Sequence, residues 1–553
     1  MIIEIKKAMQ SHSIDFLIIK NTNRFFLEYL NDNEKFIELI TNFTGSNATI
    51  IITLNNSYFF TDGRYTLQAS GQIDLQEFTV IDIGNQNVND FLLEKIEKLD
   101  NIAINSNLLS VNEADILQKI ISNKGAKLTI INDDFLNKII VDNIKINKIN
   151  NKENNQKIKD IKAYFCNINA SGEDCYSKIT RVIDNFHNFD AIFITKPEDL
   201  CWLINIRGND LDFTPLFTAF AILTKNKELA IFIDDKDFAR ITILQNLLSK
   251  MAKQNIDNST SIAIYGESQL PNIINHLRIE NIAIDPNFTN YESYQILLNS
   301  NITITKQQSI ISRLKVIKNS NEINGAKKGQ IIDSVAVIKF LYWLENQINT
   351  KQYVDELTAS DYLLKLRKKS PNFISPSFET ISAFASNGAI IHYNSNQKTN
   401  LQIRPSGLYL FDSGGQYFDE EIMATTDITR TILIGDANNE MINDFTRVLK
   451  GHINLARMIF PKQHHPAQID AIARYNLWLD GKDYKHSTGH GVGSFLSVHE
   501  GPVAISKNSN YPLAAGMILS NEPGYYQQNS YGIRLENLLL VKILIKIFYA
   551  LKP

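Results

Sequence analysis

Five side chains of the kinds that bind metal ions lie in the last third of the chain, each in a distinctive sequence context. They are Asp412, Asp427, His490, Glu522 and Glu536, within FDSGGQY, TTDITRT, STGHGVG, SNEPGYY and GIRLENL, respectively. Four carboxylates and one imidazole form an oxygen-rich donor set, which suits two divalent cations. A pair of such cations can activate a water molecule for hydrolysis. The residue types therefore predict a metal-dependent hydrolase.

Strand and turn signals place three of these carboxylates at the ends of strands. Asp412 follows the apolar run LYLF, and Asp427 precedes the run ITRTILI. Two antiparallel strands joined by a hairpin would bring these aspartates together. Glu522 precedes Pro523 and Gly524, which form a strong turn signal. Taken alone, each aspartate is also compatible with an ordinary turn or strand-end residue.

His490 lies among glycines, in GHGVG, where backbone and metal could approach closely. A phosphate-binding loop is a weaker interpretation, because the spacing matches neither GxGxxG nor a P-loop with its lysine. His499 follows nine residues later, and an odd separation on an unbroken strand points two side chains to opposite faces. Both histidines can reach one site if the Gly-Val-Gly-Ser segment bends. Otherwise His499 is a supporting or core histidine.

Two further polar residues, Arg534 and His392, are candidates for the same site. Arg534 and Glu536 are two positions apart, so a strand would place both on one face. The arginine could hold a metal-bound carboxylate or orient substrate, although a surface ion pair is the alternative. His392, near the end of NGAIIHY, could donate a proton or hold a developing anion. Taken alone, it is also compatible with a structural role.

Composition excludes several classes of protein. A chain of 553 residues is too long for one core, and a net charge of -3 implies no basic surface for nucleic acid. Cys166, Cys175 and Cys201 lack CxxC spacing, which indicates a reducing compartment and no disulfide framework, although the first two could ligate a metal. The charged start lacks a secretory signal, and the apolar end is interrupted by Lys542 and Lys546. We expect a cytoplasmic protein without a membrane or nucleic-acid partner.

The chain divides into three blocks, which we place at residues 1–150, 156–312 and 314–553. A polar segment at residues 145–159, KINKINNKENNQKIK, is expected to be a linker. The second block repeats the first, because FDAIFITK mirrors IDFLIIK and each is expected to be a buried strand. Two small α/β domains are the simplest interpretation. The third block opens with helical patterns, and its later strand-like segments hold every candidate ligand.

Together and in this order, the motifs closely resemble the X-prolyl aminopeptidase (aminopeptidase P) branch of the creatinase/methionine-aminopeptidase superfamily. The resemblance covers nearly the whole chain and includes NFTGSNAT, FTDGRYTLQA, WLINIRGNDLDFTPLF and GHGVGSFLSVHEGP. It implies an α/β (α+β) protein with two creatinase-like N-terminal domains before a pita-bread catalytic domain. It also implies release of the N-terminal residue from peptides with proline in second position.

The resemblance further implies how the five ligands share two divalent metal ions. Asp412 would bind one ion through both oxygens, and Asp427 and Glu536 would bridge the pair. His490 and Glu522 would complete the shell of the second ion. Oxygen-rich ligation favours Mn²⁺, with Zn²⁺ or Co²⁺ as alternatives.

The same resemblance assigns roles in the reaction. Glu522 would relay a proton for the attacking water. His392 and His499 would assist substrate binding and the tetrahedral intermediate, and Arg534 matches an arginine that lines the site. Peptides with N-terminal Xaa-Pro are the expected partners, and a homodimer is possible.

Two segments depart from the family's pattern. The connection between Asp412 and Asp427 is longer than usual, with the extra residues around 420–424 at the expected hairpin tip. Such an insertion costs little if the strands keep register, whereas a one-residue slip would turn an aspartate away. The final segment, KILIKIFYALKP, does not resemble the family's tail. A truncated or frameshifted reading frame would explain this difference. The altered tail is expected to expose apolar surface, weaken a dimer or reduce activity.

Two other functions compete with this interpretation. A prolidase-like dipeptidase would use the same metal centre, but the two N-terminal domains and GHGVGSFLSVHEGP favour the aminopeptidase. A non-catalytic pita-bread binding protein is the other alternative. Such proteins have typically lost ligands, whereas all five ligand positions are filled here.

Overall fold

The computed structural model describes residues 1–132, 134–139, 161–252, 260–462, 464–545 and 548–553. These residues form two compact units, each assembled from several stretches of chain. The first unit comprises Met1–Ala163, Ile179–Leu200 and Thr218–Ser309, and the second comprises Tyr164–Lys178, Cys201–Phe217 and Ile310–Pro553. The whole of the expected linker at residues 145–159 lies outside the described residues, as do residues 140–144 and 160.

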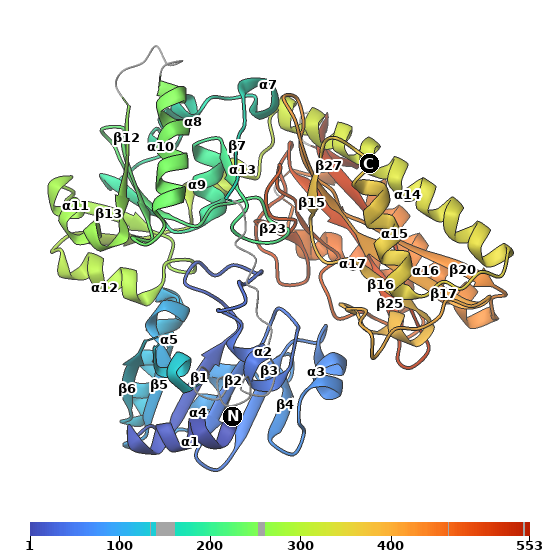
Figure 1. Ribbon diagram of the computed structural model, residues 1–553, viewed down its shortest axis with the longest axis horizontal. Coiled ribbons are helices and arrows are strands. Elements are labelled where there is room, and N and C mark those ends of the chain that lie inside the picture. Colours follow the sequence, from blue (N-terminus) through green and yellow to red (C-terminus); the bar gives the residue numbers. More distant parts are fainter. Residues whose placement is uncertain (133, 140–160, 253–259, 463, 546–547) are drawn as a thin grey trace. The chain divides into compact units, whose positions relative to one another are not determined.

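The first unit contains two six-stranded sheets with the same topology (Figure 1). Their orders are β4-β3-β2-β1-β5-β6 and β12-β11-β10-β8-β13-β14, with matching parallel and antiparallel pairs. The predicted repeat is confirmed, because β1 and β8, from IDFLIIK and FDAIFITK, take equivalent places. The strands are β1 Phe16–Lys20, β2 Thr49–Thr53, β3 Ser57–Thr61, β4 Phe78–Asp82, β5 Asn101–Asn105, β6 Lys127–Ile131, β8 Ala191–Ile194, β10 Phe220–Thr224, β11 Glu228–Ile233, β12 Ser261–Gly266, β13 Asn281–Ile284 and β14 Thr303–Lys306.

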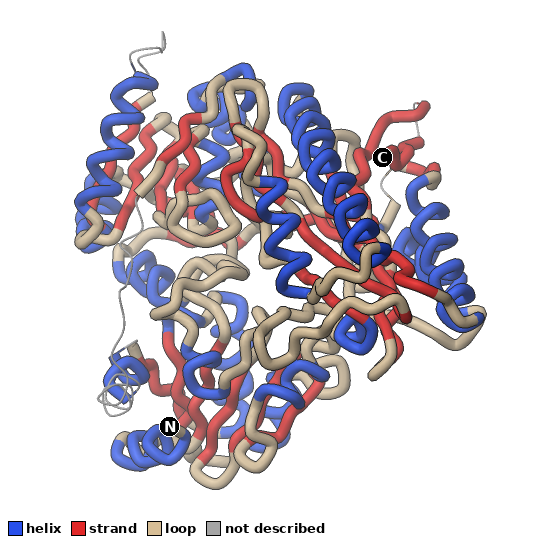
Figure 2. Tube along the Cα trace, turned by 45° about the vertical axis from the view of Figure 1, so that its right-hand side comes forward, coloured by secondary structure: helices blue, strands red, loops and turns tan. Residues whose placement is uncertain are grey.

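Helices cover both faces of the first of these sheets, which explains why its strands read as continuous apolar runs (Figure 2). Leu17 and Ile19 face one core with α1 and α2, whereas Phe16 and Ile18 face the other with α4 and α5. The helices of the whole first unit are α1 Ile2–Ser11, α2 Phe36–Thr41, α3 Thr66–Gln72, α4 Val88–Lys95, α5 Val111–Lys124, α10 Phe238–Ala252, α11 Leu270–His276 and α12 Tyr291–Asn299, with short turns η1 Ser106–Leu108 and η2 Glu267–Gln269. Two more helices, α8 Cys175–Ile183 and α9 Pro197–Leu203, contribute residues to both units.

The second unit combines helices with three- and six-stranded sheets. The sheet orders are β16-β17-β20, β15-β18-β19 and β21-β28-β27-β24-β22-β23, with the pairs β25-β26 and β7-β9. The strands are β7 Ala163–Phe165, β9 Ile206–Gly208, β15 Phe373–Pro376, β16 Ile381–Phe384, β17 Ser406–Ser413, β18 Gly415–Phe418, β19 Met423–Thr425, β20 Ile428–Gly435, β21 Ile459–Pro461, β22 Gly489–Gly491, β23 Glu500–Ile505, β24 Ile518–Asn521, β25 Gly524–Gln527, β26 Tyr531–Arg534, β27 Asn537–Ile545 and β28 Phe548–Lys552. The helices are α7 Ile168–Ser171, α13 Ile310–Lys315, α14 Ser320–Asn349, α15 Glu356–Arg367, α16 Asn439–Ala456 and α17 Pro466–Trp478, with the turn η3 Ala385–Ala389.

Local signals explain how α14, the long helix predicted from its apolar pattern, begins and packs. Asn319 Oδ1 accepts hydrogen bonds from backbone amides of the first turn, and the Glu322 carboxylate accepts one from the Asn319 amide, which forms a capping box. Further along, a Cβ at Gly329 would lie 2.2 Å from the Cβ of Ala424. This glycine therefore allows β19, which lies between Asp412 and Asp427 in the chain, to approach the helix closely.

The final segment of the chain forms part of the six-stranded sheet. Its last strand, β28, pairs with β27 on one side and with β21 on the other. Ala550 and Leu551 are buried in β28, whereas Ile543 and Leu544 of β27 are exposed. The tail therefore supplies core residues and also leaves some apolar surface. In the described part of the chain, no helix is long and apolar enough to cross a membrane.

Replacing Leu551 with alanine should lower the free energy of unfolding by about 2–5 kcal/mol, because its side chain is 0% exposed and the change leaves a cavity. Ile543→Ala is the matched control, since that side chain is 63% exposed on the neighbouring strand and should have a much smaller effect. Chemical denaturation of both variants measures the difference. Equal losses would contradict the placement of β28 in the core.

Candidate metal centre

The register of one hairpin places Asp412 and Asp427 on the same face. Asp412 of β17 lies opposite Thr429 of β20, and Asp427 precedes Thr429 by two residues. Residues opposite each other, and those two positions along, share a face of a sheet. The tip lies at Asp419–Ile422, where the Asp419 carboxylate accepts hydrogen bonds from two backbone amides. The strands that carry Asp412 and Asp427 therefore keep their register, and the residues between them form β18, the tip and β19.

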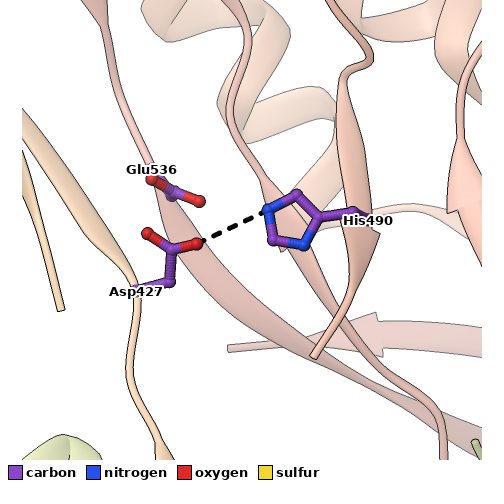
Figure 3. Close-up of side chains that lie close together, drawn as sticks. All are labelled: Asp427, His490 and Glu536. Carbon is purple, nitrogen blue, oxygen red and sulfur yellow. Dashed lines mark ion pairs between the residues drawn. The ribbon is translucent and has the colours of Figure 1, made fainter. Parts of the chain in front are cut away.

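Three of the candidate ligands form a compact group. One ligand atom from each of Asp427, His490 and Glu536 lies within 4.8 Å of the others. Figure 3 shows the three side chains pointing toward one another, with His490 Nε2 3.5 Å from Asp427 Oδ2. The Nδ1 atom of His490 lies 3.0 Å from the carbonyl oxygen of Gly491. That contact needs the hydrogen on Nδ1, so the neutral ring would present Nε2 to an ion.

The chain between His490 and His499 bends, which is the condition under which both were expected to reach one site. Strand β22 ends at Gly491, and its pairing with β23 shifts register between His490 and Gly491. Gly493 N donates to the carbonyl of Ser497 and closes a turn. As a result, the two imidazole rings meet edge to face, with centroids 4.3 Å apart.

Glu522 joins the group from the end of β24. Its Oε1 atom lies 3.3 Å from His490 Nε2 and accepts a 3.0 Å hydrogen bond from Ser520 Oγ. Its backbone amide donates to the carbonyl of Thr488 at 2.8 Å, which anchors the turn before Pro523. The carboxylate is partly exposed, unlike those of Asp427 and Glu536.

Arg534 links Asp412 to the rest of the site. Its Nη2 and Nε atoms donate to Asp412 Oδ2 at 2.7 and 3.2 Å. Thr429 Oγ1 accepts from Arg534 Nε at 3.4 Å and donates to Glu536 Oε2 at 2.7 Å. The structure thus makes Arg534 part of a buried network rather than a surface ion pair.

The structure places His392 at the edge of this network. It is partly buried in the loop after η3, and the carbonyl of the preceding residue, Ile391, accepts a 3.3 Å hydrogen bond from Arg534. A Cβ at Gly532 of β26 would lie 1.7 Å from the carbonyl of Gly388, so this glycine lets η3 pack directly on the strand that carries Arg534.

The electrostatics of the site fit bound cations. Burial, with the nearby Asp427 and Glu522 charges, raises the pKa of Asp412 to about 6 despite its arginine partner. Burial and the neighbouring carboxylates likewise raise the pKa of Glu536 well above its usual range. Burial disfavours the charged His490, but its acidic neighbours raise its pKa to about 9. Asp412 Oδ1 is buried and has no hydrogen-bond partner among the described residues. Divalent cations would offset the repulsion among the carboxylates, and one of them could be coordinated by Asp412 Oδ1.

Sequence patterns did not identify several residues that complete the site. Tyr526 accepts a 2.7 Å hydrogen bond from Arg534 Nη1, and its hydroxyl lies 2.9 Å from His486 Nε2. His486 Nδ1 lies 3.8 Å from Glu522 Oε2. Tyr526 follows the NEPG turn and His486 precedes GHGVG by a few residues, but neither has a spacing that signals a ligand. Thr429 had no signal beyond its closeness to Asp427.

Three family models together match most of the chain. Creatinase/Prolidase N-terminal domain models match residues 2–133 and 152–322, and metallopeptidase family M24 matches residues 324–542. Xaa-Pro aminopeptidase 1 of Dictyostelium discoideum is 32% identical over 97% of this chain and 84% of its own length. A probable Xaa-Pro aminopeptidase P of Laccaria bicolor is 32% identical over 98% of this chain and 81% of its own length.

Solved structures agree with these matches. The X-prolyl aminopeptidase of Caenorhabditis elegans, a cytosolic enzyme with a di-nuclear active site, has a TM-score of 0.86 and 26% identity over 98% of this chain and 86% of that chain. An Xaa-Pro dipeptidase from Bacillus anthracis shares the fold over 67% of this chain and 95% of that chain, with a TM-score of 0.54 and 22% identity. The chain therefore belongs to metallopeptidase family M24 and, within it, to the α/β X-prolyl aminopeptidases with two creatinase-like N-terminal domains.

Proposed function

We propose that this protein is a metal-dependent aminopeptidase that releases the N-terminal residue from peptides with proline in second position. The observation that carries the proposal is the convergence of Asp427, His490 and Glu536 within 4.8 Å, in a chain that aligns over nearly its whole length with Xaa-Pro aminopeptidases. The substrate class is inferred from the relatives, and the geometry provides a cluster of side chains that could hold metal ions for the hydrolysis. Along the chain, we propose domains at residues 1–150, 156–312 and 314–553.

Five residues would hold two divalent metal ions: Asp412, Asp427, His490, Glu522 and Glu536. Their oxygen-rich donor set favours Mn²⁺, with Zn²⁺ or Co²⁺ as alternatives. When bound, such ions lower the pKa of a water molecule and polarise the scissile carbonyl. The di-nuclear active site of the C. elegans enzyme supports the count of two.

The catalytic candidates would bind substrate, stabilise the tetrahedral intermediate and transfer protons. Glu522 is partly exposed beside His490, so its carboxylate can accept the proton of the attacking water and pass it to the leaving proline nitrogen. His499 stacks edge-on against His490 and can donate a hydrogen bond to the tetrahedral oxyanion, with His392 assisting. Arg534 keeps Asp412 ionised and correctly oriented.

An Xaa-Pro bond is a tertiary amide without an N–H group, so a peptidase cannot recognise it through that donor. Specificity must then come from a surface shaped for the pyrrolidine ring. We further propose a cytoplasmic location, because the C. elegans enzyme is cytosolic, and peptides with N-terminal Xaa-Pro as partners.

Cleavage of peptides should distinguish this function from its alternatives. Protein supplied with Mn²⁺ should release arginine from Arg-Pro-Pro and leave a peptide without proline intact. Glu522→Gln should lower kcat at least about 100-fold, because the proton acceptor is lost. Glu421→Gln, at the exposed hairpin tip, should keep full activity. Cleavage of the dipeptide Ala-Pro alone would instead support a prolidase.

Metal content gives a prediction that does not depend on turnover. After dialysis against Mn²⁺, the protein should retain two ions per chain by elemental analysis, and a strong chelator should remove both together with activity. Asp427→Asn and His490→Ala should each retain fewer ions, because each removes a ligand. Glu421→Gln is again the control. Unchanged metal content in both ligand variants would contradict the proposed centre.

A further inference from the structure

A buried arginine from a distant part of the sequence holds the loop between His490 and His499. Arg207, in β9, belongs to the segment Cys201–Phe217, which packs within the same compact unit as the site. Its side chain is 0% exposed. Its donors reach four backbone carbonyls, namely Phe495 O at 2.7 Å from Nε, Ser494 O at 3.2 Å from Nη2, and Cys201 O and Ile206 O at 2.6 and 3.4 Å from Nη1.

The chemistry of this contact requires arginine. A buried charge is costly unless its donors are satisfied. Within the described part of the chain, every hydrogen-bond partner of Arg207 is a backbone carbonyl. The planar guanidinium can reach both Ser494 and Phe495 while its other edge binds the carbonyls of its own segment, whereas a lysine ammonium is a compact point charge. The arrangement thus ties two stretches of backbone together through one side chain.

Side chains from the hairpin between Asp412 and Asp427 hold the next residue of the loop. Gln416 Nε2 donates to Leu496 O at 2.8 Å and to Phe213 O at 2.9 Å. Thr425 Oγ1 lies 3.1 Å from Leu496 O and accepts from Leu496 N at 3.2 Å. Three consecutive carbonyls of the loop, at residues 494–496, are therefore held by polar side chains.

The loop has a backbone conformation that needs such support. Phe495 has φ of 52°, in the left-handed region that a bulky side chain rarely adopts. Its buried ring stacks on Phe418, with centroids 4.9 Å apart, and meets Tyr164 edge to face at 5.7 Å. Strained backbone persists where its surroundings determine it from several sides.

The hydrogen bonds from Arg207, Gln416 and Thr425 to residues 494–496, which we call the clamp, determine where the chain returns to the site. The loop leaves the metal-ligand candidate His490, turns at Phe495, and comes back at His499, whose ring lies 4.3 Å from that of His490. We propose that Arg207 is a positioning residue for His499. The segment Cys201–Phe217, which carries Arg207, would then help to hold the loop of the active site in place. The kinetic test of this inference rests on the proposed aminopeptidase function.

A double-mutant cycle tests whether Arg207 acts through His499. Arg207→Met should lower kcat/KM at least about tenfold, because a misplaced catalytic group loses transition-state stabilisation. Arg207→Lys should lose less. In a His499→Ala background, Arg207→Met should change kcat/KM less than about twofold, because the two residues act as one unit. Arg367→Lys is the control, since Arg367 is buried in the same unit but pairs with Asp333. Additive losses would overturn the proposal.

Hydrogen exchange provides a readout that is independent of activity. Amides of residues 493–499, which include the hydrogen-bonded amides of Gly493 and Leu496, should exchange faster in Arg207→Met than in the wild type or Arg367→Lys. If the wild type cleaves no Xaa-Pro peptide, the proposed function fails while this measurement still judges the clamp. If Arg207→Met does not fold, Gln416→Met takes its place in both measurements. Unchanged exchange would refute the clamp.

Discussion

The structure of the catalytic unit depends on burying acidic side chains close together. Asp412, Asp427 and Glu536 are almost inaccessible to solvent, and in the ionised form their carboxylates repel one another. Such an arrangement is stable only where positive charge enters the same space. Arg534 supplies part of it through Asp412. The remaining deficit makes the site suitable for divalent cations, and the surrounding hairpins hold the carboxylates in place against their repulsion.

Hydrogen bonds between backbone strands, rather than contacts among the ligand side chains, hold the carboxylates in position. The β17–β20 register puts Asp412 and Thr429 opposite each other, and the amide of Glu536 donates to the carbonyl of Thr429. Thr429 therefore joins the aspartate hairpin to the strand end that carries Glu536. The same holds at the chain's end, where β28 pairs between β21 and β27 in the sheet that contains β22 and β24. Residues far from the reaction thus determine its geometry.

The compact units do not follow the linear blocks of the sequence. The segments 164–178 and 201–217 lie within the second block, yet they pack with the unit that contains the metal-ligand candidates. The block boundaries at 150, 156, 312 and 314 therefore remain a prediction about the order of domains along the chain. The packing of these segments shows that a linear boundary does not describe which residues support the site. It also gives WLINIRGNDLDFTPLF a structural role, because Arg207 lies within that motif.

The sequence by itself determined the residue types and the local elements. Apolar runs predicted β1 and β8, and the order of carboxylates and glycines indicated the chemistry, because such patterns depend on neighbours along the chain. Two questions stayed conditional: the register between Asp412 and Asp427, and the bend before His499. Tertiary structure decided both, since each depends on partners from distant segments. Arg207 acts on a loop almost three hundred residues away, with a sequence separation of 288 to Phe495, and such a contact leaves no local pattern to read.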